Sequence, residues 1–284
     1  MKLIAAILGG LGLALACTPA LAQTGQGTGA APSNFQQGLD AEKAGNYALA
    51  RQKFDLACNV DRSGAGCLNL AILQSHPDYG AVNEVLARKA FKSGCELESA
   101  KSCLELGRYQ KAGRGGPRDL KGAQVTLTES CYLFKTASAC QMLGDLRRFD
   151  LKEPALARDA YRDGCDAGLT GSCLSYATLL SSTVGGPADY PAAIAIFERQ
   201  CTSGDSFYCA VAGQNYVESG MPQADTKAEP LLRKACDMRA VAGCFRLGEL
   251  LVRKGGKANQ VAARELFTRA CDMQMYDACQ KLKP

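Results

Sequence analysis

The chain has 284 residues, of which 47% are hydrophobic and 21% are charged, so it has enough apolar material to fold and is not of the disordered class. Its net charge at pH 7 is +5, a surplus too small to predict nucleic acid as a partner. The sequence contains fifteen cysteines but a single histidine, His76, which excludes metal and catalytic sites that need several histidines.

The first residues have the features of an export signal. A lysine precedes an apolar run over residues 3–16, and Ala20 and Ala22 match the small-residue pattern of a cleavage site. The run is short for a membrane span, so we expect none in the mature chain. We therefore predict a signal peptide over residues 1–22, cleaved before Gln23, and a periplasmic or secreted protein.

Two other interpretations of this segment stay open. The apolar run could remain as an uncleaved anchor, or the chain could be a lipoprotein anchored through Cys17, although residues 14–16 form a poor lipobox. Residues 23–33 are mostly Gly, Thr, Ala and Gln, a composition typical of a flexible lead.

Beyond the lead, over residues 34–284, the chain repeats one pattern seven times: a cysteine, seven or eight other residues, and a second cysteine. The first cysteines follow one another at intervals of 34 to 37 residues. A period of this length marks a solenoid of two-helix units. The pairs are Cys58 and Cys67, Cys95 and Cys103, Cys131 and Cys140, Cys165 and Cys173, Cys201 and Cys209, Cys236 and Cys244, and Cys271 and Cys279.

A helical pattern stands in front of every first cysteine. Alanine lies eight residues before it and a large apolar residue four residues before it. Because positions four apart share one face of a helix, these residues form a buried stripe on what we call helix B of each unit. Short polar residues about twelve residues before the cysteine are the expected N-caps of helix B: Asn46, Asn83, Asp119, Asp189, Asn259 and, one residue later in its unit, Asp225.

The second cysteine of each pair opens another helix, which we call helix A. A small residue follows four positions later, and in four units it is glycine. Glycine inside a helix costs about 1 kcal/mol relative to alanine, so its recurrence predicts close approach of a neighbouring helix. The predicted hairpins cover residues 34–59, 64–97, 100–133, 137–167, 170–203, 206–238 and 241–273, and a half unit over 277–284 covers the end.

The cysteines are predicted to form structural disulfides. Removing the leader leaves fourteen, an even number, and export favours an oxidising compartment. Pairing near neighbours uses all fourteen, whereas the alternative register, which joins Cys67 to Cys95, leaves Cys58 and Cys279 unpaired; both registers stay open. No C-x2-C occurs, so we expect neither a metal nor a cofactor.

These motifs resemble a known family. The period near 36, the Leu-Gly of helix A, the Gly-Gly-Pro turn and the Ala-x3-Phe-x3-Cys stripe are similar to Sel-one-like repeats, relatives of tetratricopeptide repeats. The cysteine pairs resemble the bacterial subclass first described as Helicobacter cysteine-rich proteins. The resemblance implies an all-α, right-handed α-solenoid of about seven repeats, with disulfides inside each pair and a scaffolding role.

An enzymatic function is the alternative that the resemblance brings, because some members of that subclass are described as weak penicillin-binding proteins or β-lactamases. The residues themselves do not favour it. No serine has a lysine three residues on, as a serine β-lactamase needs, and Lys92-Ser93-Gly94 matches K-T-G only over three residues. We predict no catalytic residue.

The predicted binding surface lies on the A helices, which usually line the concave face of a solenoid. Residues one and five positions after the second cysteine face away from the buried stripe, and an apolar row beside a polar row suits a peptide. The alternative is that the leucines contact the neighbouring unit and the polar row is merely solvated. The rows are Leu68, Leu104, Gln141, Leu174 and Phe245, and Arg108, Asp145, Thr178, Gln214 and Glu249. The expected function is an exported scaffold that binds a protein or peptide in the cell envelope.

Overall fold

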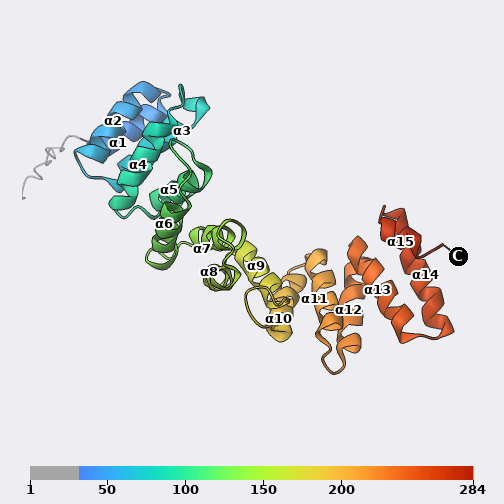
Figure 1. The fold of residues 1–284 in the computed structure, drawn as a ribbon. Coiled ribbons are helices and arrows are strands. Elements are labelled where there is room, and N and C mark those ends of the chain that lie inside the picture. Colours follow the sequence, from blue (N-terminus) through green and yellow to red (C-terminus); the bar gives the residue numbers. More distant parts are fainter. Residues whose placement is uncertain (1–31, 284) are drawn as a thin grey trace, which may run out of the picture. The chain divides into compact units, whose positions relative to one another are not determined.

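The computed structural model describes residues 32–283, and this part of the chain is an array of helices that follow one another in sequence order (Figure 1). It contains fifteen α-helices, a 3-10 helix η1 (Pro77–Tyr79) and a π-helix η2 (Leu146–Asp150), with no strand among the described residues. The predicted leader, its cleavage before Gln23 and the lipidation alternative at Cys17 lie outside the described residues.

The helices pair into the seven predicted hairpins, and each helix packs against the next one along the chain. The predicted all-α repeat architecture is therefore confirmed. The A helices are α1 (Asn34–Lys43), α3 (Gly64–Ser75), α5 (Ala100–Ala112), α7 (Ala137–Asp145), α9 (Thr170–Leu180), α11 (Ser206–Ser219) and α13 (Val241–Lys254). The B helices are α2 (Tyr47–Asn59), α4 (Glu84–Glu96), α6 (Leu120–Tyr132), α8 (Pro154–Asp166), α10 (Tyr190–Thr202), α12 (Ala224–Asp237) and α14 (Lys257–Asp272), and α15 (Tyr276–Gln280) forms the predicted half unit.

The core is built from the stripe on the B helices. The large residue four positions before each first cysteine is buried in every hairpin, with Tyr161 0% and Phe267 5% exposed. It rests on the small residue of helix A in its own hairpin: a Cβ added to Gly144 would lie 2.4 Å from Cε1 of Tyr161. The close approach predicted from the recurring glycines is thus confirmed, and the approaching helix is the partner within the hairpin.

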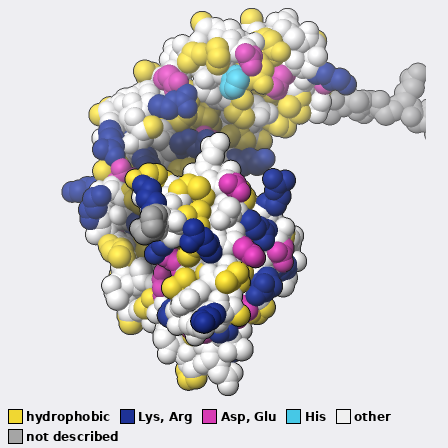
Figure 2. Space-filling view, turned by 90° about the vertical axis from the view of Figure 1, so that its right-hand side faces the viewer, with side chains coloured by type: hydrophobic (Ala, Val, Ile, Leu, Met, Phe, Trp, Pro, Cys, Tyr) yellow, Lys and Arg dark blue, Asp and Glu magenta, His cyan; other side chains and the backbone are white. Residues whose placement is uncertain are grey.

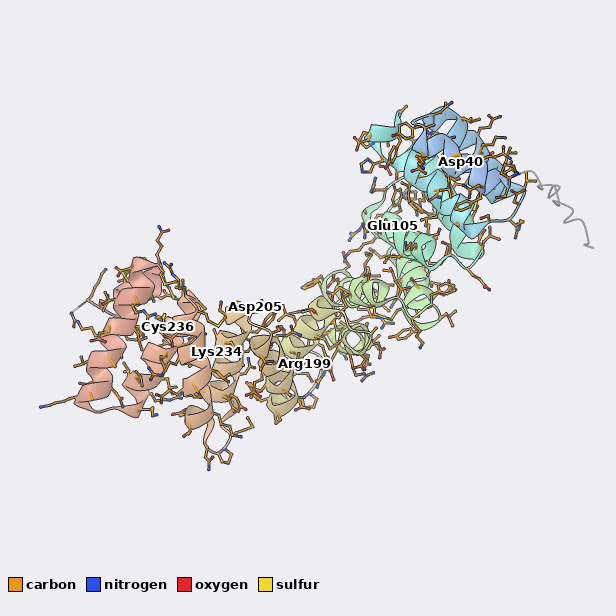
Figure 3. All side chains as sticks on the ribbon, turned by 180° about the vertical axis from the view of Figure 1, so that it is seen from behind. Asp40, Glu105, Arg199, Asp205, Lys234 and Cys236 are labelled. Atoms are coloured by element: carbon orange, nitrogen blue, oxygen red, sulfur yellow. A yellow bond between two sulfur atoms is a disulfide. The ribbon has the colours of Figure 1, made fainter. Side chains whose placement is uncertain are left out.

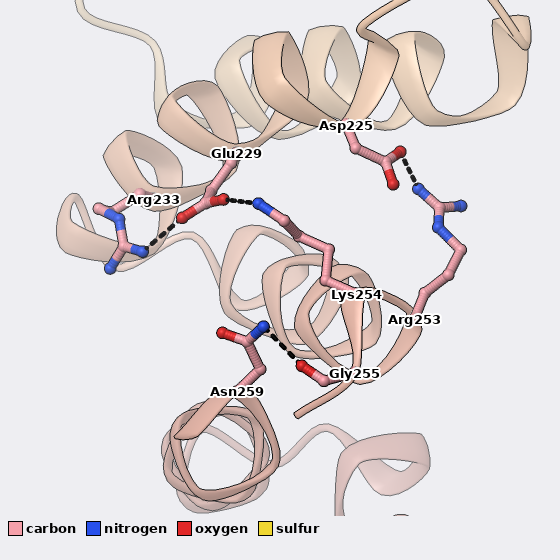
Figure 4. A network of polar contacts seen from close by, with 7 residues as sticks. All are labelled: Asp225, Glu229, Arg233, Arg253, Lys254, Gly255 and Asn259. Atoms are coloured by element: carbon pink, nitrogen blue, oxygen red, sulfur yellow. Dashed lines mark hydrogen bonds and ion pairs between the residues drawn. The ribbon is translucent and has the colours of Figure 1, made fainter. Parts of the chain in front are cut away.

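Four of the predicted N-caps accept a hydrogen bond from a backbone N–H of the first turn: Asn46, Asn83, Asp119 and Asp189. The prediction is wrong for Asp225 and Asn259, because α12 and α14 begin before these residues, at Ala224 and Lys257. Asn259 instead donates from Nδ2 to the carbonyl of Gly255, 2.7 Å away, and so ties α14 to the preceding turn (Figure 4).

Each hairpin is joined to the next by a disulfide between the end of a B helix and the start of the following A helix. The Cα atoms of the bonded pairs lie 4.4 to 4.8 Å apart. Inside every disulfide loop one residue has a left-handed backbone, and in five of the seven loops it is not glycine. The bonds are Cys58–Cys67, Cys95–Cys103, Cys131–Cys140, Cys165–Cys173, Cys201–Cys209, Cys236–Cys244 and Cys271–Cys279. The left-handed residues are Arg62, Glu98, Lys135, Gly168, Gly204, Arg239 and Gln274.

A second set of links, which the sequence analysis missed, joins several B helices to the next hairpin near its A–B turn. The residue seven positions before the first cysteine makes them: Arg88 and Arg158 donate from Nη1 to the carbonyls of Pro117 and Pro187, both at 2.9 Å. In the sixth hairpin Glu229 takes this position and binds Lys254 at 2.6 Å (Figure 4). No helix in the described part of the chain is both long and apolar enough to span a membrane.

Candidate peptide-binding surface

A cavity of about 550 Å³ lies between the A helices of the second and third hairpins, α3 and α5. We call it the α3–α5 pocket. Leu68, Ile72, Phe91 and Leu104 give it apolar walls, and it is also lined by Asn69, Ser75, His76, Lys101, Glu105, Tyr109 and Arg114. Figure 2 shows hydrophobic side chains gathered beside the histidine on this part of the surface.

Tyr109 and Arg114 hold one side of the α3–α5 pocket in place. The Tyr109 ring is 1% exposed and packs edge-on against Phe91, with ring centroids 5.0 Å apart. The guanidinium of Arg114 stacks 4.3 Å from the Tyr109 ring centroid and donates to Oε1 of Glu84 at 2.5 Å. These contacts fix the wall without filling the cavity.

The electrostatics of this wall favour its neutral phenol and its charged guanidinium. Burial raises the pKa of Tyr109. The hydrogen bond to Glu84 raises the pKa of Arg114. The pocket can therefore offer a neutral, largely apolar surface with a cationic edge, which suits an apolar side chain near a carboxylate.

The sequence analysis did not single out Tyr109 and Arg114. A signal for Tyr109 exists: the sixth residue after the second cysteine is a buried leucine in four units, but it is Tyr109 in α5 and Asn215 in α11. A residue with a polar group at a buried leucine position is unusual and marks a candidate site.

Two of the predicted groove residues, Leu68 and Leu104, come together in the α3–α5 pocket. Arg108, on the same helix as Leu104, is exposed and lies 3.5 Å from Glu105 of the pocket wall. In this part of the array the structure places apolar and polar groove residues next to one another.

In the middle hairpins the predicted groove residues are engaged in contacts with other residues of the array. Gln141 donates from Nε2 to Asp145 at 3.2 Å and accepts from the Ser172 hydroxyl at 2.8 Å. Asp145 also accepts from the Tyr161 hydroxyl at 2.7 Å. Leu174 packs partly into the core, and Thr178 is exposed and donates to the Leu174 carbonyl at 2.8 Å.

Near the C-terminal end, Gln214 and Glu249 line a second cleft of about 280 Å³ between α11 and α13. Gln214 donates to Glu218 at 2.6 Å, and Glu249 pairs with Arg246 at 2.8 Å, so polar contacts within each helix lie beside the apolar lining residues Val217 and Leu250. Phe245 does not line a surface. It is 5% exposed and packs against Phe267 with ring centroids 5.7 Å apart, which corrects its assignment to the groove.

No cluster of three or more His, Cys, Asp or Glu side chains that could hold a metal ion occurs within residues 32–283. Every cysteine in this range is bonded to another.

Solved structures show the repeat fold. A protective antigen of uropathogenic Escherichia coli with an SLR fold superposes with a TM-score of 0.61 over 88% of this chain, at 22% identity, and the chain spans 55% of that protein. A Sel1 repeat protein from Oxalobacter formigenes superposes with a TM-score of 0.54 over 84% of this chain and 97% of its own, at 17% identity. The predicted Sel-one-like repeat fold is confirmed, and the narrower resemblance to the Helicobacter subclass stays a prediction.

No protein-family model matches the chain. A curated relative does: cytochrome c oxidase assembly factor 7 of Xenopus tropicalis is 32% identical over 197 residues, which cover 66% of this chain and 84% of the relative. The chain belongs to the cytochrome c oxidase assembly factor 7 family.

Membership of this family corrects two predictions from the sequence. A scaffold of the cell envelope, with a β-lactam hydrolase as its alternative, is wrong as the function, and a periplasmic or secreted location is wrong, because the curated relatives are cytochrome c oxidase assembly factors. The physical reason is that disulfides require an oxidising setting but do not specify which one. The prediction of a disulfide-bonded, cysteine-rich repeat is unaffected.

Proposed function

We propose that this chain is a protein-binding scaffold in the assembly of cytochrome c oxidase, and that the α3–α5 pocket receives an apolar side chain of its partner. The observation that carries the role is the match to an assembly factor over 84% of that relative's length. A helical repeat array offers surface to a partner without needing a catalytic group.

The geometry of the α3–α5 pocket supports it as the point of contact. Its volume of about 550 Å³ is enough for a large side chain, and Leu68 and Leu104 provide apolar contact from two successive A helices. Lys101 is exposed at the same pocket and can pair with a carboxylate on the partner. The disulfide Cys95–Cys103 holds the start of α5, so the wall is largely formed before binding.

The test replaces the native protein, in a strain that lacks it, with tagged variants and measures cytochrome c oxidase activity and co-purified proteins. The pocket variant carries Lys101→Glu and Leu104→Gln. The matched control carries Lys121→Glu and Leu133→Gln, which change an exposed lysine and a leucine that is 72% exposed on and beside α6.

Wild type and the control are expected to restore oxidase activity and to recover the same partner. Loss of an apolar wall contact together with charge reversal at Lys101 is expected to cost about 2 kcal/mol of binding, so the pocket variant should recover the partner about 30-fold less well. Normal oxidase in the strain that lacks the protein contradicts the assembly role. If a folded pocket variant fully restores oxidase activity and partner recovery, the proposed site is contradicted but the assembly role is not.

A further inference from the structure

The disulfide between the fourth and fifth hairpins, Cys165–Cys173, differs from the others in what surrounds its sulfur atoms. Arg199, on the following helix B (α10), directs Nη2 toward both of them, at 3.8 Å from Sγ of Cys173 and 4.0 Å from Sγ of Cys165. Figure 3 labels Arg199 on its helix. A guanidinium at this distance stabilises a thiolate and lowers the pKa of the thiol that would form.

Exposure of the cysteine residues is the second feature that separates the seven bonds. In four of them both cysteines are buried, with exposures of 3% or less. Cys165 is only partly buried while its partner Cys173 is 4% exposed, so an incoming group reaches the bond from the Cys165 side. Only two further bonds have a partly buried cysteine: Cys95–Cys103 and Cys271–Cys279.

Neither of these two bonds has a cation at the position of Arg199, which is two residues before the first cysteine of the following pair. For Cys95–Cys103 the following helix B has Glu129 there, an acidic residue. The bond Cys271–Cys279 is the last pair and is followed only by the C-terminal half unit. Cys165–Cys173 is therefore the one bond of the seven that combines a partly exposed cysteine with a cation beside its sulfur atoms.

At the next two junctions a cation is present but serves another contact. Lys234 and Arg269, at the position equivalent to Arg199, donate to the carbonyls of Cys201 and Cys236, each at 3.2 Å. Figure 3 labels Lys234 and Cys236. These cations cap the last turn of the preceding helix B, and the bonds beneath them are buried. Among the described residues, Arg199 is the cation whose side chain contacts disulfide sulfur.

We propose that Cys165–Cys173 is a site of reversible thiol exchange that takes a low-molecular-weight thiol such as glutathione. The thiolate attacks Sγ of Cys165, the bond between the two sulfur atoms breaks, and its electron pair goes to Sγ of Cys173. Cys173 leaves as a thiolate beside Arg199, and Cys165 carries the thiol as a mixed disulfide. A second glutathione thiolate that attacks the glutathione sulfur of this mixed disulfide releases glutathione disulfide and leaves Cys165 as a thiolate, which completes the exchange. Attack of the Cys173 thiolate on Sγ of Cys165 instead expels glutathione and reverses it.

Exchange at this bond removes the covalent link between α8 and α9 and leaves the other six links intact. The inference rests on the contacts of one junction and is independent of the proposed role in oxidase assembly.

The test exposes the oxidised, folded chain to glutathione, traps free thiols with N-ethylmaleimide at intervals, and locates both labels by mass spectrometry of peptides. Glutathione on Cys165 with N-ethylmaleimide on Cys173 is the expected first product. Arg199→Gln should slow its appearance about fivefold, because the leaving thiolate loses its cation. Lys234→Gln, which removes the equivalent cation over a buried bond, should leave the rate at Cys165 unchanged.

A gain of reactivity provides the complementary measurement. Glu129→Arg places a cation over the partly exposed Cys95–Cys103 bond and should speed exchange there. A loosened fold cannot imitate the result for Arg199→Gln, since loosening speeds exchange, and the buried Cys236–Cys244 bond reports it in the same sample. Exchange first at another bond, or an equal rate at Cys165 with and without Arg199, overturns the proposal.

Discussion

Replacing Gly144 by alanine adds one methyl group where helix α7 packs against the Tyr161 ring of α8. The added Cβ would lie 2.4, 2.5 and 2.9 Å from Cε1, Cδ1 and Cζ of Tyr161, where carbon atoms normally keep about 3.5 to 4.0 Å. The ring is 0% exposed, and its hydroxyl donates to Asp145 at 2.7 Å. The ring therefore cannot move aside without breaking or distorting this partly buried hydrogen bond.

The magnitude follows from three contributions. Overpacking of a buried side chain costs about 1 to 3 kcal/mol. Loss or distortion of the hydrogen bond to a carboxylate adds about 1.5 kcal/mol. Alanine returns about 1 kcal/mol through its higher helix propensity. We expect Gly144→Ala to lower the free energy of unfolding by about 2.5 kcal/mol.

Urea unfolding followed by circular dichroism, with all disulfides intact, measures this difference. Gly171→Ala is the matched control, because it also lies in an A helix but its Cβ would meet only Oε1 of Gln141, at 3.6 Å; it should be neutral or stabilising. Tyr161→Leu, which copies the leucine at this position in α6 and α12, should recover part of the loss when combined with Gly144→Ala. A Gly144→Ala protein as stable as wild type would refute the packing argument.

Three further predictions concern ionisation and covalent structure. Burial and then the hydrogen bond to Asp145 raise the pKa of Tyr161. Its contribution to stability is therefore complete below the unfolded pKa of about 10 and is lost as the pH rises above that value. In urea titrations at alkaline pH, Tyr161→Phe should lose less stability with rising pH than wild type does. Hydrogen bonds from Lys254 and then Arg233 lower the pKa of Glu229. Its contribution to stability is therefore present above the unfolded pKa of about 4.3 and is lost as the pH falls below that value. Glu229→Gln should lower the melting temperature at neutral pH but not at pH 2, and an equal lowering at both pH values would contradict the assignment. Peptide mapping of the unreduced protein should return only near-neighbour cysteine links between residues 58 and 279, and a link between Cys67 and Cys95 would contradict the pairing in the structure.

The repeat fold could be predicted from the sequence because its signals recur. The stripe in front of each first cysteine and the glycine behind each second one appear in unit after unit, so chance matches average out. The left-handed junction residues could not be predicted, since Arg62 and Lys135 have no preference for that conformation and adopt it because the helices on either side are already fixed.

The candidate site was less predictable for a related reason. Leu68 and Leu104 could be assigned to one helical face by counting, and they do meet in the α3–α5 pocket. Counting placed Phe245 on the same face, but whether a residue on that face is covered depends on its neighbours, and Phe267 covers it. Contacts between repeats, such as that of Arg199 with sulfur, depend on side-chain reach and leave no local sequence pattern.

Every unit of the array carries its own disulfide to the unit that follows, together with the left-handed residue in the loop that the disulfide closes. A duplicated or deleted unit would therefore bring or remove a complete joint, and its neighbours would need no compensating change. Length is a property that such a chain can alter in whole steps, and members of one family built in this way can differ in the number of units while each joint keeps the same construction.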